Sequence, residues 1–231
     1  MGPQRFGWEH LVYLATFVVI CVPGFICAKK YAKSEKSQTI ILKSLAVLLL
    51  GCIIFNRLSL VFKYDEPRWI ALIPDSICGL DSLFLSLVVL FGKKDNPALH
   101  FLWHISLVGG ALTSIAPSFI GQNPSFLYLP TISGLLHHTM SVVVVIALLL
   151  FNQVHITYKK WRYTVTGIGI YIAIGAFLIT FVGLDDAVNM RSPLVGNLTV
   201  WPLLPVYAVG YTIVLSVIEL VRKKIAKKSN A

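Results

Sequence analysis

The hydrophobic positions of this chain form seven long runs separated by short polar connections. A membrane-spanning helix needs about 20 mostly apolar residues, and seven segments reach that length: residues 8–28, 40–62, 70–92, 98–120, 131–152, 163–184 and 200–222. The connections between the runs are too short to fold as separate domains. The pattern predicts an all-α, polytopic membrane protein with seven transmembrane helices in a single domain over residues 1–231.

Composition supports this interpretation. Hydrophobic residues make up 56% of the chain and charged residues 13%, whereas soluble domains have about 25% charged residues. The first apolar run lacks a small-residue cleavage site and is long enough to span, so we expect it to be retained. A formal net charge of +10 is explained by basic loops on one side of a membrane, and we expect no nucleic-acid partner.

The distribution of lysine and arginine predicts the orientation. Fifteen basic residues lie on one side of the seven predicted spans: in the first, third and fifth connections, at Lys43 near the start of the second span, and in the tail 222–231. Four lie on the other side. Basic residues favour the cytoplasmic side. The amino terminus is therefore predicted outside and the carboxyl terminus in the cytoplasm, with the protein in a cell membrane, most simply the bacterial cytoplasmic membrane.

Polar residues inside the spans are concentrated toward the outer side. Ionisable groups are costly within a membrane and mark functional sites. The third span contributes Asp75, Cys78 and Asp81, the second contributes Asn56 and Arg57, and the fifth contributes a histidine pair; Asn189 follows the sixth span, beside Asp185 and Asp186. Their shared depth predicts an outward-facing polar cavity.

Helical spacing relates the polar residues of the third span. Asp75, Cys78 and Ser82 are three and four positions apart, so a helix over 70–92 would place them on one face. Asp81 would lie about 60° further round from Cys78, within reach of a neighbouring helix. A purely structural explanation is also open for each of them, because buried thiols are usually inert and small residues mediate packing between membrane helices.

The fifth span contains the adjacent residues His137 and His138, which a helix places about 100° apart. Either can act as a base, or can be a hydrogen-bonded core residue. Arg57 needs an acidic partner when buried, for which Asp75 and Asp81 are the candidates, and it can instead bind the phosphate or carboxylate of a ligand. Asn56, Ser82 and Asn189 complete the predicted substrate-binding set.

The order of these features resembles the YwaF-like bacterial integral membrane family, which is related to animal transmembrane protein 164. The resemblance rests on Pro74 with Cys78, on Trp103 through Gly109-Gly110, on the histidine pair, on Asn189-Met190, and on Trp201-Pro202 through Pro205 and Tyr207. It extends over about residues 6–211. This chain is a divergent member, because Ser76 and Gly79 stand where the family often has histidine and aspartate.

The resemblance implies a phospholipid acyltransferase that uses the third-span cysteine and a histidine. On this hypothesis Cys78 accepts the acyl group, His137 or His138 is the base, Asp81 or Asp75 orients that base, and Arg57 holds a lipid phosphate. We expect phospholipid or lysophospholipid as the partner, and no cofactor or metal, since the four cysteines lack metal-ligand spacing. Whether a protein partner exists is open.

Two other functions are compatible with the same residues. One is a non-catalytic membrane protein whose outer cavity binds a lipid or peptide. The other is a proton-coupled transporter of small solutes, which would use the histidines and carboxylates as a relay. The predicted inner half of the bundle is poor in titratable groups, so a continuous polar path across the membrane is not evident.

Overall fold

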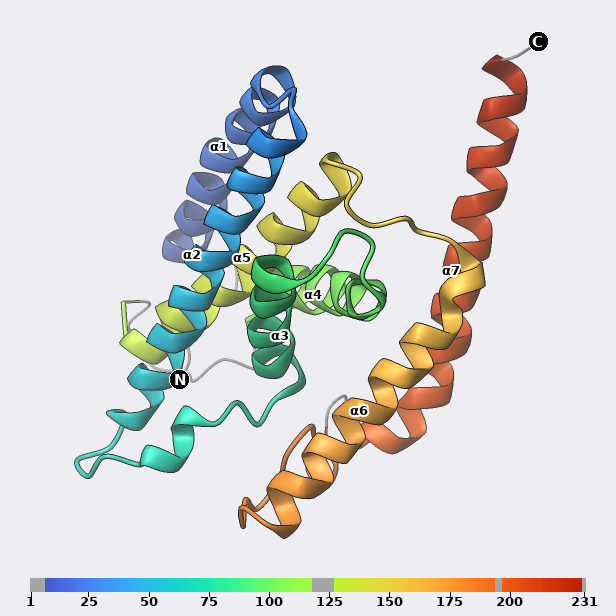
Figure 1. The fold of residues 1–231 in the computed structure, drawn as a ribbon. Coiled ribbons are helices and arrows are strands. Elements are labelled where there is room, and N and C mark those ends of the chain that lie inside the picture. The colour runs from blue at the N-terminus through green and yellow to red at the C-terminus, as the bar shows by residue number, and fades with distance from the viewer. Residues whose placement is uncertain (1–6, 118–126, 194–196, 230–231) are drawn as a thin grey trace. The chain divides into compact units, whose positions relative to one another are not determined.

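The computed structural model describes residues 7–117, 127–193 and 197–229 (Figure 1). In this part of the chain the regular elements are helices, and no β-strand occurs. The α-helices are α1 (Trp8–Tyr31), α2 (Glu35–Val61), α3 (Ile77–Phe91), α4 (Pro97–Ile115), α5 (Leu129–Leu150), α6 (Trp161–Thr180) and α7 (Val200–Ser229). Two short 3-10 helices, η1 (Trp69–Leu72) and η2 (Tyr158–Lys160), precede α3 and α6.

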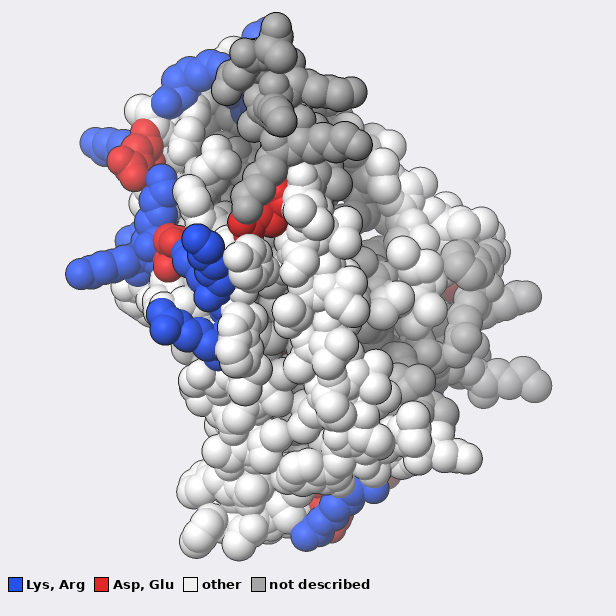
Figure 2. Space-filling model, turned by 90° about the vertical axis from the view of Figure 1, so that its right-hand side faces the viewer, with Lys and Arg blue, Asp and Glu red and all other residues white. Residues whose placement is uncertain are grey.

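The prediction of an all-helical, multi-pass membrane protein is confirmed. Over the described ranges, six helices are long and apolar enough to cross a bilayer, and α3 is an apolar helix of 15 residues. At 1.5 Å per residue α3 is about 22 Å long, shorter than a hydrocarbon core of about 30 Å. Seven spans and their orientation therefore remain predictions. Figure 2 shows charged side chains gathered mainly at the upper left and at the bottom of the view, with a broad uncharged surface between these groups.

The expected helix over 70–92 is wrong at its beginning. Residues 73–76 are not helical, and α3 begins at Ile77, so Asp75 precedes the helix instead of sharing a face with Cys78 and Ser82. Pro74 explains the difference: a proline disfavours helical backbone in the residue before it, and Ile73 is extended, with ψ 121°.

The described chain divides into two compact units. The first contains α1, α2, α3, the part of α4 from Leu102 onward, and α5. Helix α5 is its core: 67% of the residues in its most apolar stretch are buried, against none in the corresponding stretch of α1. Two hydrogen bonds attach α1 to this unit, from His10 Nε2 to the carbonyl of Ser114 (2.8 Å) and between the Tyr13 and Thr139 hydroxyls (2.7 Å).

The second unit contains residues 75–77, residues 95–101 at the start of α4, and the chain from Val154 onward. Phe101 packs edge-on against Tyr171 of α6, with ring centroids 4.9 Å apart. This packing requires Gly167, because a Cβ there would lie 2.2 Å from the Phe101 ring. The single domain predicted from the sequence remains a prediction.

Candidate functional site

A narrow polar cavity, too tight to hold a water molecule, lies among α3, α4 and α5 in the first unit. Its lining includes Cys78, Asp81 and Ser82 from α3, Ser106 and Gly110 from α4, and His138 and Ser141 from α5. Ligand pockets are commonly about 300–1,000 Å³, so the helices as packed here leave no room for a lipid group. Four residues predicted from the sequence for the site thus meet around one space.

Two adjacent glycines of α4 allow α3 and α5 to approach this space. A Cβ at Gly109 would lie 3.3 Å from Sγ of Cys78. A Cβ at Gly110 would lie 2.7 Å from the backbone oxygen of His138 and 2.8 Å from Val142 Cγ2, closer than packed atoms tolerate. Small residues permit this kind of close approach between membrane helices. The glycine pair therefore brings the thiol and the histidine to adjoining sides of α4.

Ser82 is the centre of the hydrogen bonds between α3 and α5. Its Oγ lies 3.1 Å from Nδ1 of His137 and 2.8 Å from Oγ of Ser141. Ser141 in turn donates to the backbone oxygen of His137 at 2.8 Å. These side chains are buried, so the contacts hold the His137 ring in one orientation. The rings of His137 and His138 are tilted by 32°, with centroids 4.1 Å apart.

Asp81 contacts a neighbouring helix, as its predicted position on the third helix suggested. The hydroxyl of Ser106 on α4 donates to its Oδ2, and both side chains are buried. A buried carboxylate is stabilised by such a donor, because an unpaired charge in a low-dielectric interior is costly. Asp81 therefore connects α3 and α4 at the edge of the cavity.

Arg57 and Asn56 belong to a second group of polar contacts in the same unit. Arg57 donates to Asn56 Oδ1 (3.2 Å) and to the backbone oxygen of Ile73 (3.4 Å). Asn56 donates to Ser133 Oγ at 3.2 Å, and Ser133 lies 2.9 Å from Ser59 Oγ. Ser133 is one helical turn before His137 on α5. Polar contacts thus continue from the guanidinium of Arg57 along α5 toward the histidine pair.

Asp75 and Asn189 lie in the second unit. The backbone oxygen of Asp75 accepts from the N–H of Val188 at 2.7 Å, and that of Asn189 accepts from the N–H of Val200 at 3.0 Å. Asp186 caps its own loop, accepting from the N–H groups of Arg191 and Ser192 at 2.9 Å. Burial opposes ionisation, but these hydrogen bonds prevail and lower the pKa of the Asp186 carboxyl. The acidic residues Asp185 and Asp186 thus take part in the local loop structure after α6.

Sequence reasoning missed Ser106, and it named Gly110 only within the family resemblance and not as a site residue. Both lie on one stripe of α4 with Ser114, at spacings of four residues, and a stripe of small residues on an apolar helix is typical of a close helix contact. That spacing was the available signal. For metal chemistry, the described residues contain no group of three or more His, Cys, Asp or Glu side chains that could hold an ion.

Comparison with known proteins gives the family. A model of the TMEM164 family matches residues 5–221. The chain belongs to the TMEM164 family. The transmembrane protein 164 part of the resemblance is therefore confirmed, while the YwaF-like relationship remains a prediction. No curated protein and no solved structure matches the chain.

Membership assigns this TMEM164-family chain to membrane proteins, in agreement with its apolar helices. The residues matched by the family model include all of α3, α4 and α5, the three helices that line the cavity.

Proposed function

We propose that this protein is a membrane-embedded acyltransferase acting on phospholipid and lysophospholipid, with Cys78 as the acyl acceptor. The observation that supports it is the placement of Cys78 and His138 around one cavity, with Asp81 and Ser82 beside them. A nucleophile and a base in one buried polar site are the components that covalent acyl transfer needs.

The transfer proceeds in two steps. The Cys78 thiol gives its proton to His138, and the sulfur attacks the ester carbonyl of a phospholipid, forming a thioester; the lysolipid alkoxide leaves and takes the proton from the histidine. The hydroxyl of a different lysolipid then loses its proton to His138 and attacks the thioester. The acyl group moves to the new hydroxyl, and the thiolate regains the proton, so no oxidant, reductant or cofactor is consumed.

The remaining residues position these groups. His137, held by Ser82 and packed against the His138 ring, fixes the second histidine. Asp81, hydrogen-bonded to Ser106, lines the same cavity as Cys78 and His138. Arg57 is the candidate for binding a lipid phosphate, because a guanidinium binds phosphate through two parallel hydrogen bonds. Asn56 orients Arg57 through its side-chain oxygen.

The test is acyl exchange in proteoliposomes containing a phospholipid donor and a fluorescent lysophospholipid. Wild-type protein is expected to convert the probe to diacyl lipid and to carry a hydroxylamine-sensitive acyl label. Cys78→Ala is expected to lose both, while Cys52→Ala, the same change at a half-buried thiol of α2, keeps both. His138→Ala is expected to slow exchange roughly 10²–10⁴-fold, whereas His155→Ala does not.

Two outcomes contradict the proposal at different levels. Full exchange by Cys78→Ala would exclude the covalent step while leaving acyl transfer in place. Absence of exchange by wild-type protein, with lipid bound but unchanged, would instead favour the non-catalytic lipid-binding function.

A further inference from the structure

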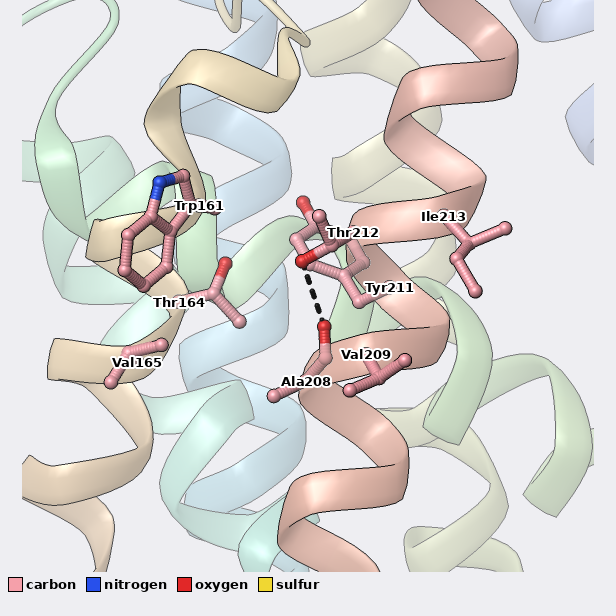
Figure 3. A pocket seen from close by; sticks show the side chains of 8 residues that line it. All are labelled: Trp161, Thr164, Val165, Ala208, Val209, Tyr211, Thr212 and Ile213. Atoms are coloured by element: carbon pink, nitrogen blue, oxygen red, sulfur yellow. Dashed lines mark hydrogen bonds between the residues drawn. The ribbon is translucent and has the colours of Figure 1, made fainter.

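A second cavity, in the other unit, lies between α6 and α7 (Figure 3). It is a groove of about 330 Å³, within the size range of ligand pockets, and its lining is mostly apolar. From α6 it is lined by Trp161, Thr164 and Val165, and from α7 by Ala208, Thr212 and Ile213 among others. Both helices are long and apolar enough to span a membrane, so a groove between them opens onto hydrocarbon.

One polar atom in this groove has no internal partner. The Thr164 side chain is 2% exposed, and in the part of the chain that the structure describes its Oγ1 makes no hydrogen bond. Figure 3 shows the side chain directed from α6 toward α7. A buried hydroxyl without a partner is destabilising, so this position favours a ligand that supplies an acceptor.

Thr212, on the α7 side of the groove, differs from Thr164 because its hydroxyl has a hydrogen-bond partner. Its Oγ1 donates to the carbonyl of Ala208, one turn earlier on α7, at 2.8 Å (Figure 3). Its hydrogen-bonding need is met within the helix, and it contributes little polarity to the groove. Of the two threonines that line the groove, Thr164 is therefore the one with a hydroxyl available to a ligand.

Basic residues that neighbour Trp161 in the sequence indicate the ligand's head group. Trp161 begins α6, and the neighbouring Lys159 and Arg162 are exposed basic residues. The other nearby lysine, Lys160, is engaged with Asp95 and His100, and the nearby acid Glu219 accepts from the Thr157 hydroxyl at 2.9 Å. Two exposed cations beside an interfacial tryptophan are typical of contact with anionic lipid head groups.

We propose that the α6–α7 groove is a binding site for an anionic phospholipid. Its phosphate lies at Lys159 and Arg162, and an ester carbonyl accepts from Thr164, about 3 Å further along α6 than Arg162. One acyl chain fills the apolar groove. The acyl chain restores the van der Waals contacts that an unfilled groove lacks. This site is separate from the proposed acyl transfer and does not depend on it.

The test uses phosphatidylcholine vesicles containing a trace of phosphatidylglycerol with a photoactivatable diazirine on its acyl chain. Labelling is expected to map to peptides from α6 and α7 and to exceed that by the matching phosphatidylcholine probe. Combining Lys159→Gln with Arg162→Gln is expected to lower labelling by phosphatidylglycerol roughly fivefold per charge removed, with little change for phosphatidylcholine.

Matched variants separate the groove from the surrounding helix surface. Ala208→Phe fills the groove and is expected to abolish the preference for phosphatidylglycerol, while Ala173→Phe, at an exposed position of α6 outside the lining, keeps it. Thr164→Val is expected to weaken labelling and Thr166→Val, at an exposed α6 position, is not. Unchanged labelling in folded Ala208→Phe, or equal labelling by the two probes in wild-type protein, would overturn the proposal.

Discussion

The hydroxyl of Ser82 on α3 lies 3.1 Å from Nδ1 of His137 on α5, although the two residues are 55 positions apart in the chain. This contact connects the helix that supplies Cys78 with the helix that supplies the histidine pair. It also occupies one ring nitrogen of His137, which leaves His138 as the histidine lining the cavity beside the thiol.

Replacing Ser82 is expected to destabilise the protein. Ser82→Ala leaves Nδ1 of a buried histidine without this partner, at a cost of about 1–3 kcal/mol. Ser86→Ala is the matched control on α3, because the Ser86 hydroxyl donates to the carbonyl of Leu83 in its own helix. Thermal unfolding in detergent measures both variants, and equal losses would contradict a special role for the Ser82 contact.

The two glycines of α4 should respond differently to alanine. Gly110→Ala places a Cβ against the backbone of His138, which cannot move without separating the helices, so we expect a loss of about 1–3 kcal/mol. Gly109→Ala meets only Sγ of Cys78, at 3.3 Å, and a side chain can adjust. Unfolding temperatures should therefore fall more for Gly110→Ala, and the reverse order would be inconsistent with the α4–α5 contact described.

The folding stability of the protein is expected to fall in acid through protonation of Asp95. Burial by itself raises the pKa of this carboxyl, but hydrogen bonds from Lys160 and from the N–H of His155 lower it below the ordinary value. A lowered pKa in the folded state means that its stabilisation is present above the unfolded pKa of about 3.9 and is lost as the pH falls through the folded pKa.

The measurement is the unfolding temperature between about pH 6 and pH 3, around the unfolded pKa of Asp95. Lys160→Gln removes the donor, brings the folded pKa closer to the unfolded one and should reduce the acid-dependent loss contributed by Asp95. Lys159→Gln removes a neighbouring charge from an exposed position and should leave that loss nearly unchanged. Identical pH profiles for the two variants would show that Lys160 does not control Asp95.

The span count is tested by topology reporters placed on either side of α3. If α3 crosses the membrane, a reporter fused after Glu66 is expected outside and one fused after Lys94 in the cytoplasm, with a carboxyl-terminal fusion also cytoplasmic. Alkaline phosphatase reports the first location and green fluorescent protein the other two. If the first two fusions report the same side, α3 does not cross the membrane, and the prediction of seven transmembrane helices is wrong.

The sequence by itself determined the helical membrane class, because runs of about 20 apolar residues have few alternatives to a membrane-spanning helix. It also singled out Cys78, Asp81 and the histidine pair, because polar groups in such runs are conspicuous. It placed the start of the third helix too early, since apolar Ile70 through Ile73 continue the hydropathy pattern while Pro74 interrupts the helical backbone.

Only the tertiary structure decided which polar residues meet. Helical periodicity relates residues within one helix, but the contacts of Ser82 with His137 and of Ser106 with Asp81 depend on how different helices are rotated against each other. Close packing at small residues such as Gly110 limits that rotation. The rotation depends on two helices at once, so it cannot be predicted from the pattern of one helix alone. The same is true of the α6–α7 groove, whose lining combines residues from two helices, among them Thr164 and Ala208.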